Sequence, residues 1–315
     1  MDNSERQKLI VIQAMLSEML NGQLDVLPKQ RDDGLIYAAM RNSVFYADVS
    51  RLPLHKFSEN WKRNIGNGTN VHFDFGSGTW EGIELGIPIT LADRDMIDQA
   101  VTFDYGDESD VGNYYVGKIE GDSDKHSIVV TADMKLHEIF YWRGDGKAGS
   151  GAKWDLTRSN KMRTHGKTSA DAAGLPIAPF LIRYDEIQAG VINHMLRMTC
   201  PQTRGCVWPG SHQTMGKLWE VVDFNPPLGA IFRLKAGFDI SPFSKTNQII
   251  LTALKQHGAI IADNGGSWFI SGCPHPDWDN DDLGKLSDAL RGSSFEAVDA
   301  SPMIVATDSY EARLV

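Results

Sequence analysis

The sequence predicts an all-β protein, a β-sandwich or jelly roll with a few short helices. Short stretches of alternating apolar and polar residues follow one another from about residue 46, and turn-forming residues separate them, with 30 glycines and 13 prolines in 315 residues. No fixed-period repeat and no glycine-rich nucleotide-binding motif interrupts this pattern. We therefore expect a β-sandwich domain over residues 46–315, preceded by an N-terminal helical extension over residues 1–45.

The extension carries one predicted helix, over residues 7–21. Apolar residues from Leu9 to Leu16 recur at helical spacing, and Gly22 follows as a C-terminal stop. Polar residues break this apolar stretch, so it lacks the pattern of a secretory signal, and the chain as written is expected in the cytoplasm. No run of about 18 apolar residues occurs, so no membrane span is predicted.

The first strands of the body are predicted from their period of two. Residues 71–80 (VHFDFGSGTW) and 99–107 (QAVTFDYGD) alternate apolar and polar positions. Residues 126–133 (HSIVVTAD) and 136–142 (LHEIFYW) are separated by only a short connection, which predicts a hairpin. A further short strand is expected at AKWDL, residues 152–156.

The second half combines strands with three helical segments. Strands are expected at residues 192–199 and 229–239, and two more in residues 259–272 are predicted to form a hairpin around Asn264-Gly265. Helices are expected at residues 244–258 and 279–292, because both segments have apolar residues at helical spacing and recognisable ends. Residues 185–190 predict a helical turn that ends at Gly190.

Net charge excludes one class of partner. The formal charge is −10, whereas binding to a nucleic-acid backbone requires a basic surface, so no nucleic-acid partner is expected. Neutral sugars, cations and basic partners remain compatible with this charge. The acidic loop at residues 104–110 (DYGDESD) could hold calcium through oxygen ligands, but its spacing fits no EF-hand, and a solvated loop is favoured.

The cysteines decide little. Cys200 and Cys206 are close enough in sequence for a short loop disulfide in an exported protein, which would leave Cys273 over. A zinc site formed by Cys273, His275 and His212 lacks the paired spacing of structural zinc sites, so free or paired structural cysteines are favoured. No metal and no cofactor is predicted.

Three carboxylates lie within residues 168–190, TSADAAGLPIAPFLIRYDEIQAG. Asp171 follows Ser169 and suits a helix cap or an Asx turn, while Asp185 and Glu186 suit the first turn of a helix. Alternatively, the three stand at the rim of a cleft for acid/base work. Glycoside hydrolysis needs two carboxyl groups about 5 to 9.5 Å apart, which these residues could reach only through the fold.

Residues 192–199 contribute two further polar side chains. Strand alternation places Arg197 on the more polar face, where it could hold a carboxylate or a sugar hydroxyl. His194 is also a candidate for substrate binding, but it shares its face with apolar residues, which favours a hydrogen-bonded core histidine.

Loops supply the remaining ligand-contact candidates. Trp208 and His212 lie in VWPGSH, where an aromatic ring and an imidazole suit ligand contact, although a buried tryptophan beside a turn fits equally well. The other candidates for substrate binding are Trp142, Asp263, Asn264 and Trp278.

Five blocks of the sequence recur together in one family. These blocks, SGAKWDL, TSADAAGLPIAP, RYDEI, INHMLRMT and ADNGGSWFISG, resemble in content and order those of largely uncharacterised, often exported bacterial proteins. The resemblance covers roughly residues 45 to 300. It implies a β-rich body that acts on polysaccharide in an extracellular or periplasmic setting, whereas the N-terminal helix and the lack of a leader depart from the family.

The predicted function is cleavage of glycosidic bonds in a polysaccharide, with hydrolysis favoured over elimination. Asp171 and Glu186 are the acid and base candidates, with Asp185 as a substitute. His212 would serve as base if the substrate were a uronic-acid polymer. The alternative is a non-catalytic carbohydrate-binding or cell-surface module that uses the same aromatic residues.

Overall fold

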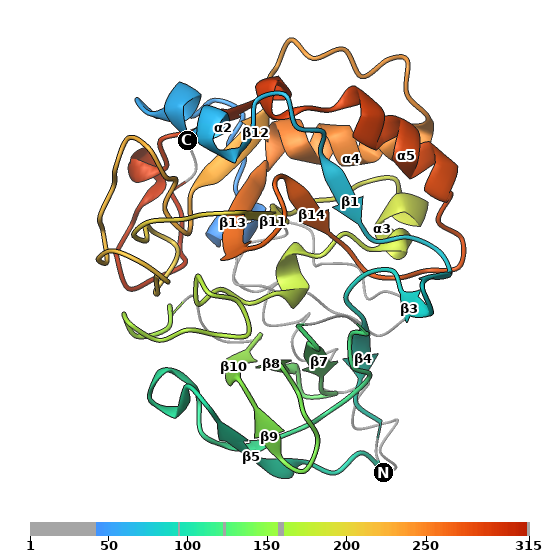
Figure 1. Ribbon diagram of the computed structural model, residues 1–315, viewed down its shortest axis with the longest axis vertical. Coiled ribbons are helices and arrows are strands. Elements are labelled where there is room, and N and C mark those ends of the chain that lie inside the picture. Colours follow the sequence, from blue (N-terminus) through green and yellow to red (C-terminus); the bar gives the residue numbers. More distant parts are fainter. Residues whose placement is uncertain (1–41, 94, 122–123, 157–160, 314–315) are drawn as a thin grey trace, which may run out of the picture. The chain divides into compact units, whose positions relative to one another are not determined.

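The structure is a computed structural model that describes residues 42–93, 95–121, 124–156 and 161–313 (Figure 1). The chain divides into a unit of residues 1–38 and a unit of residues 39–315, and the second unit is described below. The helix predicted at residues 7–21 lies outside the described residues.

A mixed six-stranded sheet forms the core of this unit. Its strand order is β1 (His72–Asp74), β14 (Phe269–Ser271), β11 (Leu196–Cys200), β13 (Ala259–Asn264), β12 (Ile231–Leu234) and β15 (Phe295–Ala297). The β1–β14 and β11–β13 pairs are parallel, and the other pairs are antiparallel. The central strand β11 is buried along its whole length, as expected of a strand covered on both faces.

Two helices predicted from the sequence are confirmed beside this sheet. Helix α4 (Lys245–Gln256) begins at Ser244, whose side chain accepts a hydrogen bond from the Asn247 backbone, and it packs against β12. Helix α5 (Asn280–Ala289) begins at Asp279, packs against β1 and contacts α4 (Figure 1). Their buried leucines and isoleucines extend the apolar core of the sheet.

Three smaller sheets complete the strands. The four-stranded sheet has the order β10 (Ser150–Asp155), β8 (Lys135–Phe140), β7 (Ser127–Val130) and β4 (Ile89–Leu91). Antiparallel pairing of β7 with β8 confirms the first predicted hairpin. The remaining sheets are β6 (Gly112–Tyr114), β5 (Gln99–Phe103) and β9 (Lys147–Ala148), and the pair β2 (Thr79–Trp80) and β3 (Ile83–Glu84).

The remaining helices are short. They are α2 (Ser58–Ile65), α3 (Tyr184–Ala189) and the 3₁₀ turns η1 (Val44–Tyr46), η2 (Gly106–Glu108), η3 (Ala178–Phe180), η4 (Gly292–Ser294) and η5 (Ser301–Met303). Helix α3 confirms the predicted turn, because it ends at Gly190, whose φ of 82° is the left-handed conformation that glycine adopts without strain.

The predicted hairpin around Asn264-Gly265 is wrong. Strands β13 and β14 do not pair with each other, because β11 lies between them. Strand β11 pairs in parallel with β13 and antiparallel with β14, with Met198 opposite Ile270. Gly265 lies at the C-terminal end of β11, where its N–H donates to the Cys200 carbonyl and a Cβ atom would lie 2.9 Å from Thr199 Oγ1, so a side chain here would crowd β11.

The described part of the chain is therefore rich in β-strands, with a minority of helix. None of the helices described is long and apolar enough to cross a membrane. None of the three cysteines, all of which lie in the described residues, forms a disulfide, so the short loop disulfide considered from the sequence is absent.

Candidate functional site

Asp171 binds Arg197 inside the protein. Two nitrogens of Arg197 donate to the carboxylate, Nη2 to Oδ1 at 2.6 Å and Nε to Oδ2 at 2.9 Å. Asp171 is 0% exposed and Arg197 5%. Arg197 also donates through Nη1 to Ser271 Oγ at 2.7 Å, so this ion pair joins the turn at residues 169–174 to β11 and β14.

This turn also contacts two other residues predicted for the site. The Ala172 N–H donates to Asp263 Oδ2 at 3.1 Å, and the Ala172 carbonyl accepts from His212 Nδ1 at 2.7 Å. Asp171, Arg197, Asp263 and His212 therefore gather around one turn. Sequence spacing alone did not indicate this, because the four residues come from segments that only the fold brings together.

The carboxyl groups of Asp263 and Glu138 have raised pKa values. Burial and the neighbouring Asp171 charge together raise the pKa of Asp263 to about 7, against the opposing effect of Arg197. Burial likewise raises the pKa of Glu138 to about 8, although the backbone N–H groups of Ile177 and Ala178 bind its carboxyl oxygens. At neutral pH the region therefore holds Glu138 largely uncharged beside the ionised pair.

His126 supplies a second positive charge to this interior. Burial alone would lower its pKa, but the Glu120 carboxylate, bonded to His126 Nδ1, raises the pKa to about 9. His126 Nε2 lies 3.3 Å from the Ala170 carbonyl, one residue before Asp171. Two buried acid–base pairs therefore contact this turn, Asp171 with Arg197 and Glu120 with His126.

Glu186 belongs to a separate cluster. It bonds Arg183 Nη2 at 2.7 Å and lies 2.9 Å from His194 Nε2, and it caps α3 by accepting the Arg183 backbone N–H at 3.0 Å. Glu186 is 1% exposed and His194 3%. Asp185 lies at the edge of the same cluster, 3.5 Å from Arg183 Nε.

Burial bears on the predicted acid/base roles of Asp171 and Glu186. Each carboxylate is enclosed and held by an arginine, which suits a structural ion pair better than proton transfer to a substrate. The two lie in different clusters. Of the four predicted catalytic residues, His212 and Asp185 keep partly exposed side chains, at 14% and 28%.

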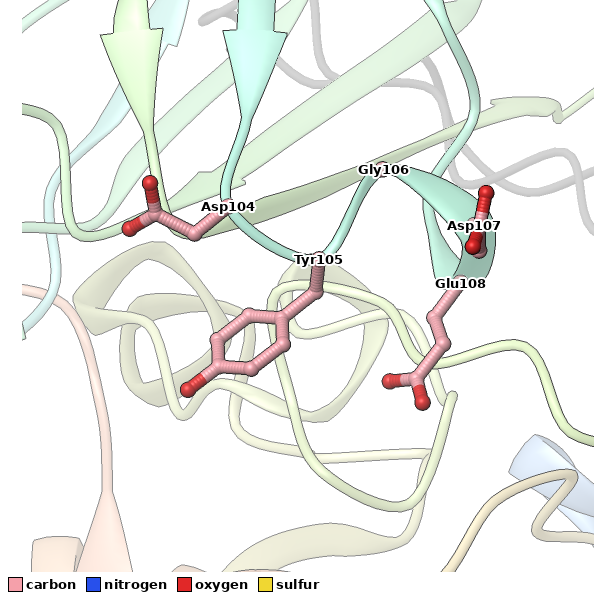
Figure 2. A pocket seen from close by; sticks show the side chains of 5 residues that line it. All are labelled: Asp104, Tyr105, Gly106, Asp107 and Glu108. Carbon is pink, nitrogen blue, oxygen red and sulfur yellow. The ribbon is translucent and has the colours of Figure 1, made fainter.

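His212 contacts Glu108, a residue that lines an open polar pocket. Its Nε2 lies 3.4 Å from Glu108 Oε2, and Glu108 belongs to a pocket of about 360 Å³ formed by residues 104–108. Figure 2 shows Tyr105 and Glu108 extending to the same side of this loop, while Asp107 turns away from them. Asp104, at the start of the loop, bonds Arg143, and this hydrogen bond lowers the pKa of Asp104.

The predicted tryptophan platforms differ in exposure. Trp278 is 3% exposed and packs on Tyr184 and Phe75, while Trp208 is 2% exposed and donates to the Ser309 carbonyl. Trp142 is only partly buried. Two of the three rings therefore contribute mainly to packing.

Asn264 joins Asp263 at the end of β13. Its Oδ1 accepts from Thr203 and Thr214, so the side chain ties two loop segments to the sheet. These hydrogen bonds anchor the loops, and the role of Asn264 in substrate binding stays a prediction.

Sequence reasoning missed several of these residues. Glu108 and Asp104 lay in a loop that was interpreted as solvated, His126 and Glu138 lay in predicted strands, and Glu120 lay in a segment for which no element was predicted. The charged residues within the apolar run LHEIFYW were the one available signal, because a charge in a buried strand requires a partner. Among the described residues, no group of three metal-ligating side chains occurs.

Comparisons with protein-family models, with curated proteins and with solved structures return no match for this chain.

Proposed function

We propose that this chain is a carbohydrate-active enzyme that cleaves glycosidic bonds by carboxylate acid/base chemistry, and that it acts at the pocket formed by residues 104–108. The observation that carries the proposal is the contact between Glu108 and His212 at this pocket. A carboxylate and an imidazole in contact, both partly open to solvent, can exchange a proton with a bound substrate.

The loop offers two carboxylates in different environments. Arg143 holds Asp104 ionised, which suits a base, a nucleophile or a stabiliser of positive charge. Glu108 faces His212, whose ring is oriented by the Ala172 carbonyl, and this pair suits protonation of the leaving oxygen. In this proposal the acid/base role passes from Asp171 and Glu186 to Asp104 and Glu108, because the latter two can be reached from solvent.

The charge of the pocket favours a neutral sugar. Its walls contain Asp104, Asp107 and Glu108; Arg143 pairs with Asp104, and the charges of the other two carboxylates would repel a uronic-acid polymer. Tyr105, 56% exposed, offers an aromatic face on which a sugar ring can stack. The charge supports hydrolysis over elimination, because elimination requires a uronic-acid substrate. The resemblance to exported bacterial β-rich proteins supports an extracellular setting, and a sandwich or jelly-roll frame remains part of the same proposal.

The experiment is mass spectrometry of products after incubation with neutral and acidic polysaccharides. Fragments that have gained water are expected from a neutral polymer and should disappear for folded Glu108→Gln and Asp104→Asn variants. Unsaturated fragments from an acidic polymer would show that the reaction is an elimination rather than a hydrolysis, with His212 as the base. A folded wild-type protein that binds a polymer without producing fragments would support the alternative, a non-catalytic carbohydrate-binding module.

A further inference from the structure

A second pocket, of about 310 Å³, shares no lining residue with the first. Its walls include three tryptophans, Trp61, Trp208 and Trp219, together with His55 and Asp299. A mainly apolar cavity of this size with a few polar groups has the general character of a small-ligand site.

Trp219 is the exposed wall of this pocket. It is 41% exposed, and its φ of 62° is a left-handed backbone conformation that is uncommon for a large side chain. A hydrogen bond from its backbone N–H to the Cys206 carbonyl, at 2.8 Å, and edge-on contact with His165 hold it in this position. The molecule thus maintains a costly conformation and leaves a large apolar ring partly in water.

The other two tryptophans line the pocket with little exposed surface, because each is only 2% exposed. Trp61 Nε1 donates to the Val222 carbonyl at 2.9 Å, and Trp208 Nε1 donates to the Ser309 carbonyl at 2.7 Å. Both indole N–H groups already bond protein atoms, so these buried rings offer a ligand only van der Waals contact, and Trp219 is the one of the three rings exposed enough for a ligand to stack on.

His55 adds a hydrogen-bond donor. The Phe57 backbone N–H donates to His55 Nδ1 at 3.2 Å, so Nδ1 is an acceptor and the proton of the neutral ring lies on Nε2. Burial lowers the pKa of His55, more than the Asp299 charge raises it, so the ring is neutral at pH 7. The ring also stacks on Trp61 with centroids 4.1 Å apart.

Asp299 adds acceptors. One of its oxygens accepts the Ser301 backbone N–H at 3.0 Å, and an ionised carboxylate has lone pairs for several further donors. The pocket therefore combines apolar faces, a neutral donor and an anionic acceptor, and no lysine or arginine lines it.

We propose that this pocket binds one ring of a neutral glycan, as a site separate from the pocket formed by residues 104–108. A sugar ring has an apolar C–H face that can stack on Trp219, and its hydroxyls can donate to Asp299 and accept from His55. A quaternary ammonium group would suit the aromatic walls but would leave the His55 donor without an acceptor, and a uronate would be repelled by Asp299. The choice of a glycan rests on the proposed function.

The test is binding measured by calorimetry to the full-length protein, with cello-, malto- and chito-oligosaccharides as probes and oligogalacturonate and choline for comparison. At least one neutral oligosaccharide should bind. Trp219→Ala should weaken that binding by about tenfold or more, and Asp299→Asn should weaken it while keeping an oxygen for Ser301. Trp80→Ala, which removes a ring that is 71% exposed outside the pocket, should leave binding unchanged.

Each contrary outcome overturns the proposal. These outcomes are unchanged affinity in folded Trp219→Ala, an equal loss in Trp80→Ala, preference for choline or oligogalacturonate, or no binding of any neutral probe. The enzyme proposal fails separately. Binding that depends on Trp219, without any cleavage, would support the glycan site and contradict the catalytic function. Cleavage together with binding that does not depend on Trp219 would support the catalytic function and contradict the glycan site.

Discussion

Arg197 donates hydrogen bonds to both carboxylate oxygens of Asp171, and both side chains are buried. The shortest contacts are 2.6 and 2.9 Å, and they connect a loop turn to the central strand β11. An arginine fork on a carboxylate fixes both groups in direction as well as distance, because the two N–H bonds are parallel. The turn that positions His212 is thereby tied to the most buried strand of the sheet.

Replacing Asp171 by asparagine should destabilise the protein strongly. The change leaves the Arg197 charge buried without its counter-ion, and loss of one partner of a buried pair typically costs about 3–5 kcal/mol. Denaturant unfolding of both proteins would measure the difference in free energy of unfolding. The matched control is Asp104→Asn, which breaks an exposed arginine pair and should barely alter stability. Equal effects of the two variants would contradict a structural role for the buried pair.

Glu138 should make stability fall as pH rises. Its pKa is about 8 in the folded protein against an ordinary value of 4.5, so the folded state binds the additional proton between these values. The stabilisation is complete below about pH 4.5 and is lost as pH rises through 8, with a slope of at most about 1.4 kcal/mol per pH unit.

The measurement compares wild type with Glu138→Gln in denaturant titrations between pH 5 and 6.5. His126, whose folded pKa of about 9 also lies above its ordinary 6.5, loses its contribution only at higher pH and so affects this window little. The wild type should lose stability relative to Glu138→Gln as pH rises. Parallel pH profiles for the two proteins would show that Glu138 is ionised throughout.

Gly174 and Gly190 form a matched pair of substitutions. Both have positive φ, of 71° and 82°, so alanine introduces similar backbone strain, on the order of 1 kcal/mol, at each. At Gly174 a Cβ atom would also lie 2.0 Å from Ser211 Oγ and 2.6 Å from the Lys167 carbonyl, whereas at Gly190 nothing lies within 4 Å. Gly174→Ala should therefore lower the melting temperature well beyond Gly190→Ala, and equal shifts would refute the close packing of the Asp171 turn against the His212 segment.

His212→Asn should reduce glycan cleavage without unfolding the protein. Loss of a positioned proton-transfer group typically costs about 10²–10⁴-fold in rate. The rate of product formation is compared with that of His72→Asn, because His72 is an exposed histidine on β1, outside the pocket. If the two variants cleave at the same rate, His212 takes no part in the reaction.

Local sequence determined several elements of this fold. Helices α4 and α5, the turn that ends at Gly190 and the β7–β8 hairpin follow from apolar spacing, caps and short connections, which act over a few residues. The hairpin predicted at Asn264-Gly265 also rested on a local signal. The pairing of β13 and β14 was instead decided by β11, which lies between them and comes from more than 50 residues earlier in the chain.

The candidate site shows the same division. Sequence alone identified Asp171, Arg197, Asp263 and His212 as candidate polar site residues in four separate segments, and the fold brings all four to one turn. It could not indicate that Asp171 is enclosed with Arg197 while Glu108 is open beside His212, because burial and charge pairing depend on residues distant in the chain. Residue type and local spacing determined which groups are polar and which segments are helical or extended. Only the tertiary structure decided which carboxylates are neutralised inside and which face solvent, because an ion pair or a pocket exists only where remote segments meet.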